Sequence, residues 1–341
     1  MDTDALHAAF RDDLLSRDTI STLSPEELSA HNAAGNTLLH LAAKYGRLAD
    51  LPPAALTAQN LLLKNEAGYT PLHQAAYGGH LAQIPPALLT REALLTRSNS
   101  GYTVLHSAAA EGHLDQLPAG FLTEELLLLR TDAGNTLVHE AAENGTLDRL
   151  PPALLTARLA SLRNAGGETV LHVAALNGHL DQVPPPLLTA DALLVKTNSG
   201  DTVLHAAAIA GHLQQIPAAL LEHDHLIIPS NNGFTVIHAA AETGQISKLP
   251  HAVLTTDLLL TRNDNGDTPV HAAASEGHLK QIPLSLLTPE LLAVRNYSGV
   301  TPLAIASQSG TLDQIPPQLH PKPPGPLQQV LIKFGLSKPP F

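Results

Sequence analysis

The sequence contains no cysteine and no tryptophan, and it has only five tyrosines and five phenylalanines among 341 residues. Without cysteine, the chain can form neither a disulfide framework nor a thiolate zinc site. Aromatic residues make up 3% of the chain, whereas hydrophobic residues together make up 44%. The core must therefore be filled mainly by leucine and alanine, as expected for small stacked units.

Basic residues are also scarce, with 19 Lys and Arg against 31 Asp and Glu, which gives a formal net charge of −12. Proteins that bind nucleic acids usually present a basic face, so we expect no nucleic-acid partner, although a basic protein partner would suit this charge. The chain begins with the acidic stretch Met1-Asp2-Thr3-Asp4, and no long apolar run follows it. This start argues against a signal peptide and a membrane span, and it predicts a soluble, cytoplasmic protein.

One block of sequence recurs through the chain, most legibly as Gly101-Tyr102-Thr103-Val104-Leu105-His106-Ser107-Ala108-Ala109-Ala110-Glu111-Gly112-His113. Its threonine returns at intervals of 33 residues. The nine copies are Thr37, Thr70, Thr103, Thr136, Thr169, Thr202, Thr235, Thr268 and Thr301. A fixed period of this length indicates a stack of repeated units in which each unit touches only its neighbours.

The stretch Thr70-Pro71-Leu72-His73-Gln74-Ala75 resembles the signature of the ankyrin repeat. The resemblance implies an all-α solenoid with short β-hairpin or turn loops, made of nine full repeats. We divide the chain into a degenerate N-terminal capping repeat (1–34), ankyrin-like repeats (35–320), and a Pro-rich linker followed by a C-terminal amphipathic helix (321–341). That last helix would fold back over the final repeat, dock on another protein, or remain disordered.

Every repeat has glycine at two positions, as at Gly101 and Gly112. The first suits a tight turn with φ > 0, and the second suits a helix C-terminal cap. Proline departs from the ankyrin pattern, because it stands where the second helix of the family should continue. Since proline inside a helix costs about 3 kcal/mol, we expect the outer helix to end near Ile84 and its equivalents. A short helical turn should follow a threonine cap, as at Thr90.

Histidine is abundant, but its positions follow the repeat. Eight of the 19 histidines occupy one column, which we call the signature histidines: His40, His73, His106, His139, His172, His205, His238 and His271. One histidine per repeat cannot readily form a zinc cluster, because packed helices stand roughly 8–10 Å apart. The ankyrin resemblance implies that these side chains bond neighbouring backbone. We therefore expect no catalytic, metal-binding or cofactor-binding residues, and no cofactor.

A further column is basic: Lys64, Arg97, Arg130, Arg163, Lys196, Arg262 and Arg295. The side chains of this basic column would either line an anion-binding edge or each lie across the next repeat. In the second case each would pair with a nearby carboxylate or helix carbonyl.

The ankyrin resemblance places recognition on the turn tips and on the inner face of the first helix of each repeat. On this surface the tyrosines of the early repeats form an aromatic patch, and acidic residues of the middle repeats follow it. Such a surface would suit an extended partner segment with apolar and then basic residues. Alternatively, these tyrosines mainly pack on neighbouring repeats. The candidate partner-binding residues are Tyr45, Tyr69, Tyr77, Tyr102, Glu111, Asp132, Glu140, Glu143, Glu168, Asp201 and Phe234.

The sequence thus favours a non-enzymatic scaffold or adaptor that binds another protein or an extended peptide on its concave surface. A structural protein that self-associates is the alternative, and an enzyme with an unrecognised site is a more remote one. Repeat architecture supports the scaffold only by analogy, because a fold alone does not determine function.

Overall fold

A computed structural model of the chain describes residues 3–118, 121–151 and 154–319. These residues form a repeated helical array without any strand. The expected hairpins are turns, with isolated bridges at Arg97–Thr103, Arg163–Thr169 and Pro229–Thr235. The chain forms two compact units, residues 1–188 (unit 1) and 189–341 (unit 2). The predicted linker and helix at 321–341 lie outside the described residues.

Unit 1 contains α1 (Thr3–Arg11), α2 (Arg17–Ser21), α3 (Pro25–Ser29), α4 (Leu38–Lys44), α5 (Ala58–Leu61), α6 (Pro71–Gly78), α7 (Arg91–Leu94), α8 (Val104–Ala110), α9 (Glu124–Leu127), α10 (Leu137–Asn144), α11 (Ala157–Ala160) and α12 (Val170–Asn177). Unit 2 contains α13 (Ala190–Leu193), α14 (Val203–Ala210), α15 (His223–Leu226), α16 (Val236–Glu242), α17 (Thr256–Leu260), α18 (Pro269–Glu276), α19 (Pro289–Leu292) and α20 (Pro302–Gln308).

Short 3₁₀ helices connect these elements. They are η1 (Leu48–Asp50), η2 (Pro53–Ala55), η3 (Leu81–Gln83), η4 (Pro86–Leu88), η5 (Leu114–Gln116), η6 (Leu147–Arg149), η8 (Leu180–Gln182), η9 (Pro185–Leu187), η10 (Leu213–Gln215), η11 (Ala218–Leu220), η12 (Ile246–Lys248), η13 (His251–Val253), η14 (Leu279–Gln281), η15 (Leu312–Gln314) and η16 (Pro317–Leu319).

The repeated threonine begins the longer helix of each repeat. In α6, Thr70 is the N-cap, and its hydroxyl accepts from the backbone N–H of His73 at 3.4 Å. The His73 ring returns the contact, because its Nδ1 accepts from the Thr70 N–H at 3.1 Å. This reciprocal arrangement satisfies two N-terminal donors that the helix itself leaves unpaired. Gly79 ends the same helix in the left-handed region, with φ of 73°.

Proline ends the next segment of each repeat, as predicted. After Gly79 the chain forms only the 3₁₀ turn η3, and the helix stops before Pro85. A second 3₁₀ turn, η4, begins at Pro86, and α7 then follows the N-cap Thr90, whose hydroxyl accepts from the Ala93 N–H at 3.2 Å. The outer layer is therefore made of single turns rather than of a full second helix.

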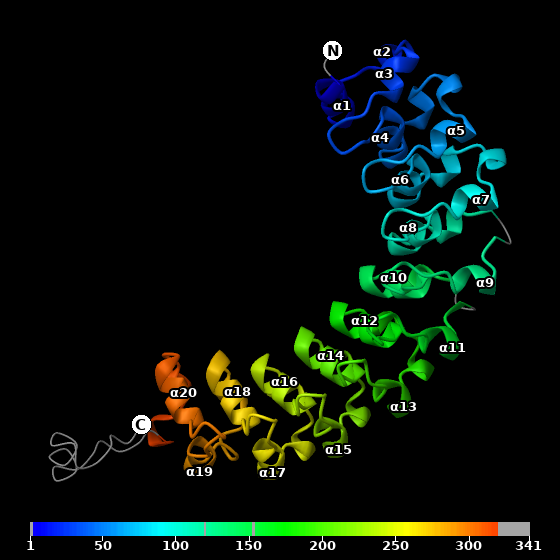
Figure 1. Cartoon of the computed structure of the whole chain (residues 1–341). Helices are drawn as coiled ribbons and strands as arrows, with labels where there is room; N and C mark the ends of the chain where they lie inside the picture. The colour runs from blue at the N-terminus through cyan, green and yellow to red at the C-terminus, as the bar shows by residue number, and fades with distance from the viewer. Residues whose placement is uncertain (1–2, 119–120, 152–153, 320–341) are drawn as a thin grey trace, which may run out of the picture. The chain divides into compact units, whose positions relative to one another are not determined.

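The longer helices of unit 1 pack in sequence order, with contacts from α4 to α6, α6 to α8, α8 to α10 and α10 to α12. Figure 1 shows them as one row, with the short helices α5, α7, α9 and α11 in a second row. In unit 2 the longer helices also pack in sequence order, with contacts from α14 to α16, α16 to α18 and α18 to α20. Fully buried alanine pairs such as Ala108 and Ala109 let these helices approach closely.

The signature histidines connect successive repeats. The Nε2 atoms of His73 and His139 each lie 3.2 Å from a backbone carbonyl oxygen in the following repeat, at Tyr102 and Glu168. Because Nδ1 accepts from a backbone N–H, the ring proton must be on Nε2, which donates to that carbonyl. The prediction that these histidines bond neighbouring backbone is confirmed.

No helix within the described ranges is both long and apolar enough to cross a lipid bilayer.

Candidate functional site

A hollow of about 420 Å³ opens over α8 in unit 1. On a helix, residues three apart share a face, and in α8 the two residues on the open face are small, Ser107 and Ala110. The same two positions in α6 are Gln74 and Tyr77, and in α10 they are Glu140 and Glu143. Small side chains between two rows of larger ones create the cavity. Its lining residues are Lys44, Tyr69, His73, Gln74, Tyr77, Tyr102, Ser107, Ala110, Glu111, Glu140, Glu143 and Asn144.

Two half-buried tyrosines from successive turns line this hollow. Tyr69 and Tyr102 each come directly before the threonine that caps a helix, so their rings lie next to each other one repeat apart. Their ring centroids are 6.5 Å apart in an edge-to-face arrangement. Each ring also packs near the signature histidine of its own repeat, with centroids 5.4 Å apart for Tyr69–His73 and 5.8 Å apart for Tyr102–His106. These contacts hold both rings in defined orientations.

The carboxyl group of Glu140 lies in the wall of the hollow and is almost completely buried, with 1% of the residue exposed. It accepts a hydrogen bond from the Tyr102 hydroxyl at 2.7 Å and another from Asn135 Nδ2 at 3.0 Å. Burial raises the pKa of Glu140, the two hydrogen bonds oppose that rise, and the nearby charge of Glu143 adds to it. Burial and the bond to Glu140 also raise the pKa of Tyr102, so its hydroxyl stays protonated and donates.

Two further carboxylates, Glu111 and Glu143, lie on the hollow. Among the residues that the structure describes, neither side chain has a hydrogen-bond or ion-pair partner. Among the described lining residues the one Lys or Arg is Lys44, whose Nζ lies 5.2 Å from the ring centroid of Tyr77 and 5.8 Å from that of Tyr45. The hollow thus combines three carboxyl groups, three tyrosine rings and a single cation.

The structure brings together six of the residues expected to bind a partner: Tyr69, Tyr77, Tyr102, Glu111, Glu140 and Glu143. Tyr45 lies outside the lining, at the end of α4, where it is 41% exposed and contacts Lys44.

The other expected residues are placed elsewhere. Asp132 pairs with Arg97 at 3.3 Å, and Glu168 accepts from Asn164 Nδ2 at 2.7 Å. Asp201 and Phe234 belong to unit 2, where Phe234 packs against His238 with ring centroids 5.3 Å apart. Their grouping with the hollow in one binding surface stays a prediction.

Several lining residues are not among those that the sequence predicts, namely Lys44, His73, Gln74, Ser107, Ala110 and Asn144. The repeat itself carried a signal for them. Aligning the helices by position shows that only α8, among its neighbours, has two small residues on its open face. Small side chains suggest no chemistry by themselves. They predict a hollow only when they are compared with the larger side chains at the same positions in adjacent repeats.

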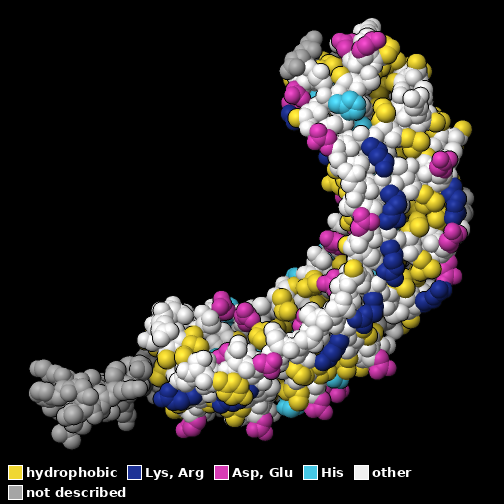
Figure 2. All heavy atoms as spheres, in the orientation of Figure 1, with side chains coloured by type: hydrophobic (Ala, Val, Ile, Leu, Met, Phe, Trp, Pro, Cys, Tyr) yellow, Lys and Arg dark blue, Asp and Glu magenta, His cyan; other side chains and the backbone are white. Residues whose placement is uncertain are grey.

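Members of the basic column lie one repeat apart in each unit, and Figure 2 shows Lys and Arg side chains recurring at intervals on the surface. Each of several members donates to the backbone carbonyl of the same column position in the next repeat. The donor–acceptor distances are 2.8 Å for Lys64–Arg97, 3.0 Å for Arg97–Arg130, 2.7 Å for Arg130–Arg163, 2.7 Å for Lys196–Pro229 and 2.9 Å for Arg262–Arg295. These side chains lie across the next repeat, as one of the two interpretations predicted.

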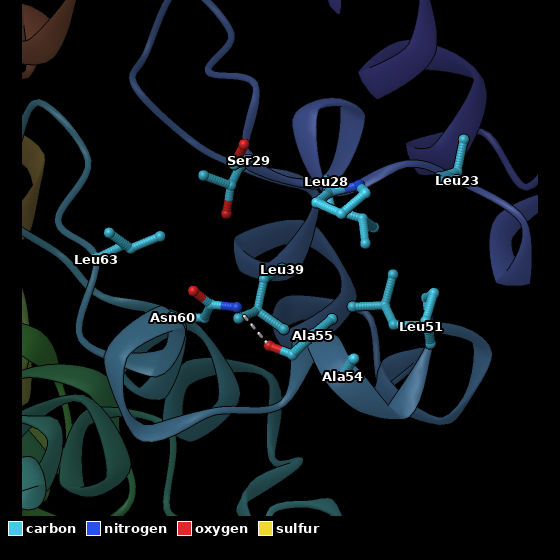
Figure 3. A pocket seen from close by; sticks show the side chains of 12 residues that line it. Leu23, Leu28, Ser29, Leu39, Leu51, Ala54, Ala55, Asn60 and Leu63 are labelled. Atoms are coloured by element: carbon cyan, nitrogen blue, oxygen red, sulfur yellow. Dashed lines mark hydrogen bonds between the residues drawn. The ribbon is translucent and has the colours of Figure 1, made fainter.

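A second hollow, of about 320 Å³, lies between the capping segment and the first repeat. Figure 3 shows its lining, in which leucines from both sides surround the opening and Asn60 Nδ2 donates to the Ala55 carbonyl at 3.0 Å. No ionisable residue lines it. Its polar lining side chains are those of Ser29, Thr37 and Asn60, so the described lining offers no charged group to a bound ligand.

Within the described part of the chain, no group of three or more His, Asp or Glu side chains is arranged to hold a metal ion. Neither the models of known protein families nor the curated proteins give a match to this sequence.

Proposed function

We propose that this chain is an ankyrin-like repeat protein that serves as a non-enzymatic scaffold. It binds another protein or an extended peptide on the face formed by α6, α8 and α10. The observation that carries this proposal is the hollow over Ser107 and Ala110, which tyrosine rings and carboxyl groups line.

The hollow is preformed, which supports a binding role. The rings of Tyr69 and Tyr102 are packed, and the carboxyl group of Glu140 is fixed by two hydrogen bonds. Groups that are already ordered lose little entropy when a partner binds. Tyrosine is also enriched among the residues that dominate binding energy at interfaces.

Exposed aromatic surface continues beyond the hollow and supports a partner larger than a small molecule. Tyr77 is 49% exposed and Tyr45 is 41% exposed, and Lys44 lies against both rings. A partner segment with one residue in the hollow would cover this aromatic surface with its neighbouring residues.

Selection from a phage-displayed random-peptide library on the immobilised protein tests this proposal. Peptides should be enriched on the natural protein and lost on an Ala110→Trp variant, in which an indole ring fills the hollow. Ser275→Trp is the matched control, because Ser275 occupies the same helix position in α18 of unit 2 and is exposed. Equal enrichment on both variants would show that the hollow is not the binding surface. Absence of any enrichment on the natural protein would count against the scaffold.

A further inference from the structure

We propose that the hollow over α8 receives a basic side chain, the guanidinium of an arginine or the ammonium of a lysine, from an extended segment of the partner. This inference rests on the scaffold function proposed above and adds the chemistry that the scaffold recognises.

The charges of the hollow favour a cation. The side-chain carboxylates of Glu111 and Glu143 have no partner among the described residues, and the buried carboxyl group of Glu140 lies in the wall. Arg149 Nη1 donates to the backbone carbonyl of Glu111 at 3.0 Å, not to its carboxylate. A cation placed between these groups gains charge-assisted hydrogen bonds, which are about twice as strong as neutral ones. An anion would meet three carboxyl groups and only one ammonium, that of Lys44.

The aromatic groups favour the same occupant. The Nζ of Lys44 already lies 5.2 Å from the centroid of Tyr77, within the range of a cation–π contact. Tyr69 and Tyr102 offer two further rings in the same hollow. Guanidinium and ammonium groups are attracted to such ring faces, and the aliphatic part of either side chain packs against the same rings.

The volume and lining of the hollow suit one long side chain. Ser107 and Ala110 line it with small side chains, and its volume is about 420 Å³. A purely apolar occupant would cover Glu111 and Glu143 without pairing them, which carries a desolvation cost. A side chain with an apolar stem and a cationic end satisfies both kinds of lining group.

Small cations test the chemistry of the hollow directly. The full-length protein is labelled with ¹³C at its alanine methyl groups, and n-butylguanidinium, n-butylammonium and the uncharged N-butylurea are titrated in turn. The Ala110 methyl signal, assigned with an Ala110→Ser variant, should move with the two cations and not with the urea. A stronger response to the guanidinium identifies arginine as the favoured residue, and a stronger response to the ammonium identifies lysine.

Two variants separate charge from shape. Glu143→Gln should weaken cation binding about threefold to tenfold, because it removes an exposed carboxylate and leaves the side-chain volume nearly unchanged. Glu242→Gln is its matched control at the same position of α16 in unit 2, and it should have no effect. Lys44→Met should strengthen binding, because it removes the cation that competes for Tyr77.

An Ala110 methyl signal that responds equally to N-butylurea, or that ignores Glu143→Gln, overturns the proposal. The scaffold function can fail separately. If peptides are selected but none of them needs a basic residue, the scaffold stands and the basic side chain is wrong. If the cations bind but no peptide is selected, the hollow's cation chemistry stands and the scaffold is wrong.

Discussion

At the scale of single residues, the signature histidines are uncharged parts of the stack. Each ring accepts a hydrogen bond from a backbone N–H at Nδ1 and can donate at Nε2. Protonation of Nδ1 would therefore place a second ring proton against that backbone N–H. Burial lowers the pKa to about 4 at five of them: His40, His73, His106, His139 and His238. These histidines therefore couple folding to pH.

We predict that the protein loses stability as the pH falls from about 6.5 towards 4. In this window the unfolded chain binds protons that the folded histidines exclude, so the free energy of unfolding rises with pH and reaches its full value above about 6.5. A pKa lowered by one unit corresponds to about 1.4 kcal/mol, and domains are typically stable by only about 5–15 kcal/mol. Several such histidines should unfold the protein before the pH reaches 4.

Urea denaturation at pH ~7 and pH ~5 measures this effect. His223→Gln provides the control, because that side chain is 41% exposed and is not a signature histidine. It should leave the pH dependence unchanged. Equal stability at the two pH values would mean that the folded histidines take up protons as readily as the unfolded chain does.

The residues of the hollow differ in how visible they were in the sequence. Tyrosines and glutamates stood out because their chemistry suggests binding, and six of them line the hollow. Asp132 also stood out, yet it pairs with Arg97 at the turn. Its direction depends on local turn geometry, which the repeat pattern does not specify. Ser107 and Ala110 did not stand out, because their small side chains create a cavity only next to the larger side chains at the same positions of the neighbouring repeats.

At the scale of elements, the sequence predicted where helices begin and end better than how long the outer ones are. The threonine caps and proline breaks act over a few residues, so they could be read from the chain directly. Between the second glycine and the proline, as from His80 to Ile84, only one turn of 3₁₀ helix fits. Neighbouring turns pair through a backbone bond, as from the Ala165 N–H to the Ala133 carbonyl at 3.0 Å.

The turn glycines allow a matched test of this close approach. Gly134 and Gly299 occupy the same position and have φ of 79° and 78°. A Cβ at Gly134 would lie 2.7 Å from the backbone nitrogen of Ala165, whereas a Cβ at Gly299 would meet no atom of the described residues within 4 Å.

We predict that alanine at either position lowers the free energy of unfolding by about 1–2 kcal/mol through left-handed strain. Gly134→Ala should cost roughly 1–3 kcal/mol more, because the next turn must shift. Urea denaturation of both variants measures the difference. Equal losses would mean that strain alone explains why glycine stands at this position.

At the scale of the whole molecule, stability should follow the number of neighbours that each repeat has. In unit 2, α16 packs between α14 and α18 and buries six residues, Val236, Ile237, His238, Ala239, Ala240 and Ala241. Among the described residues the last helix is α20, which contacts α18 and the short α19 and of whose residues only Pro302 and Ala306 are buried. Ala304 stands in its signature position, so this repeat also lacks the histidine bond.

We predict that α20 opens well before α16, because among the described residues α20 packs on one longer helix while α16 packs between two. Hydrogen exchange of the intact protein, followed by mass spectrometry on peptides from residues 236–242 and 302–308, should show weaker protection in the second peptide. Low urea concentrations should widen the gap, since partial unfolding from the end exposes surface there first. Equal protection of the two helices, with a shared dependence on urea, would show that unit 2 unfolds as one cooperative block despite the few residues that α20 buries.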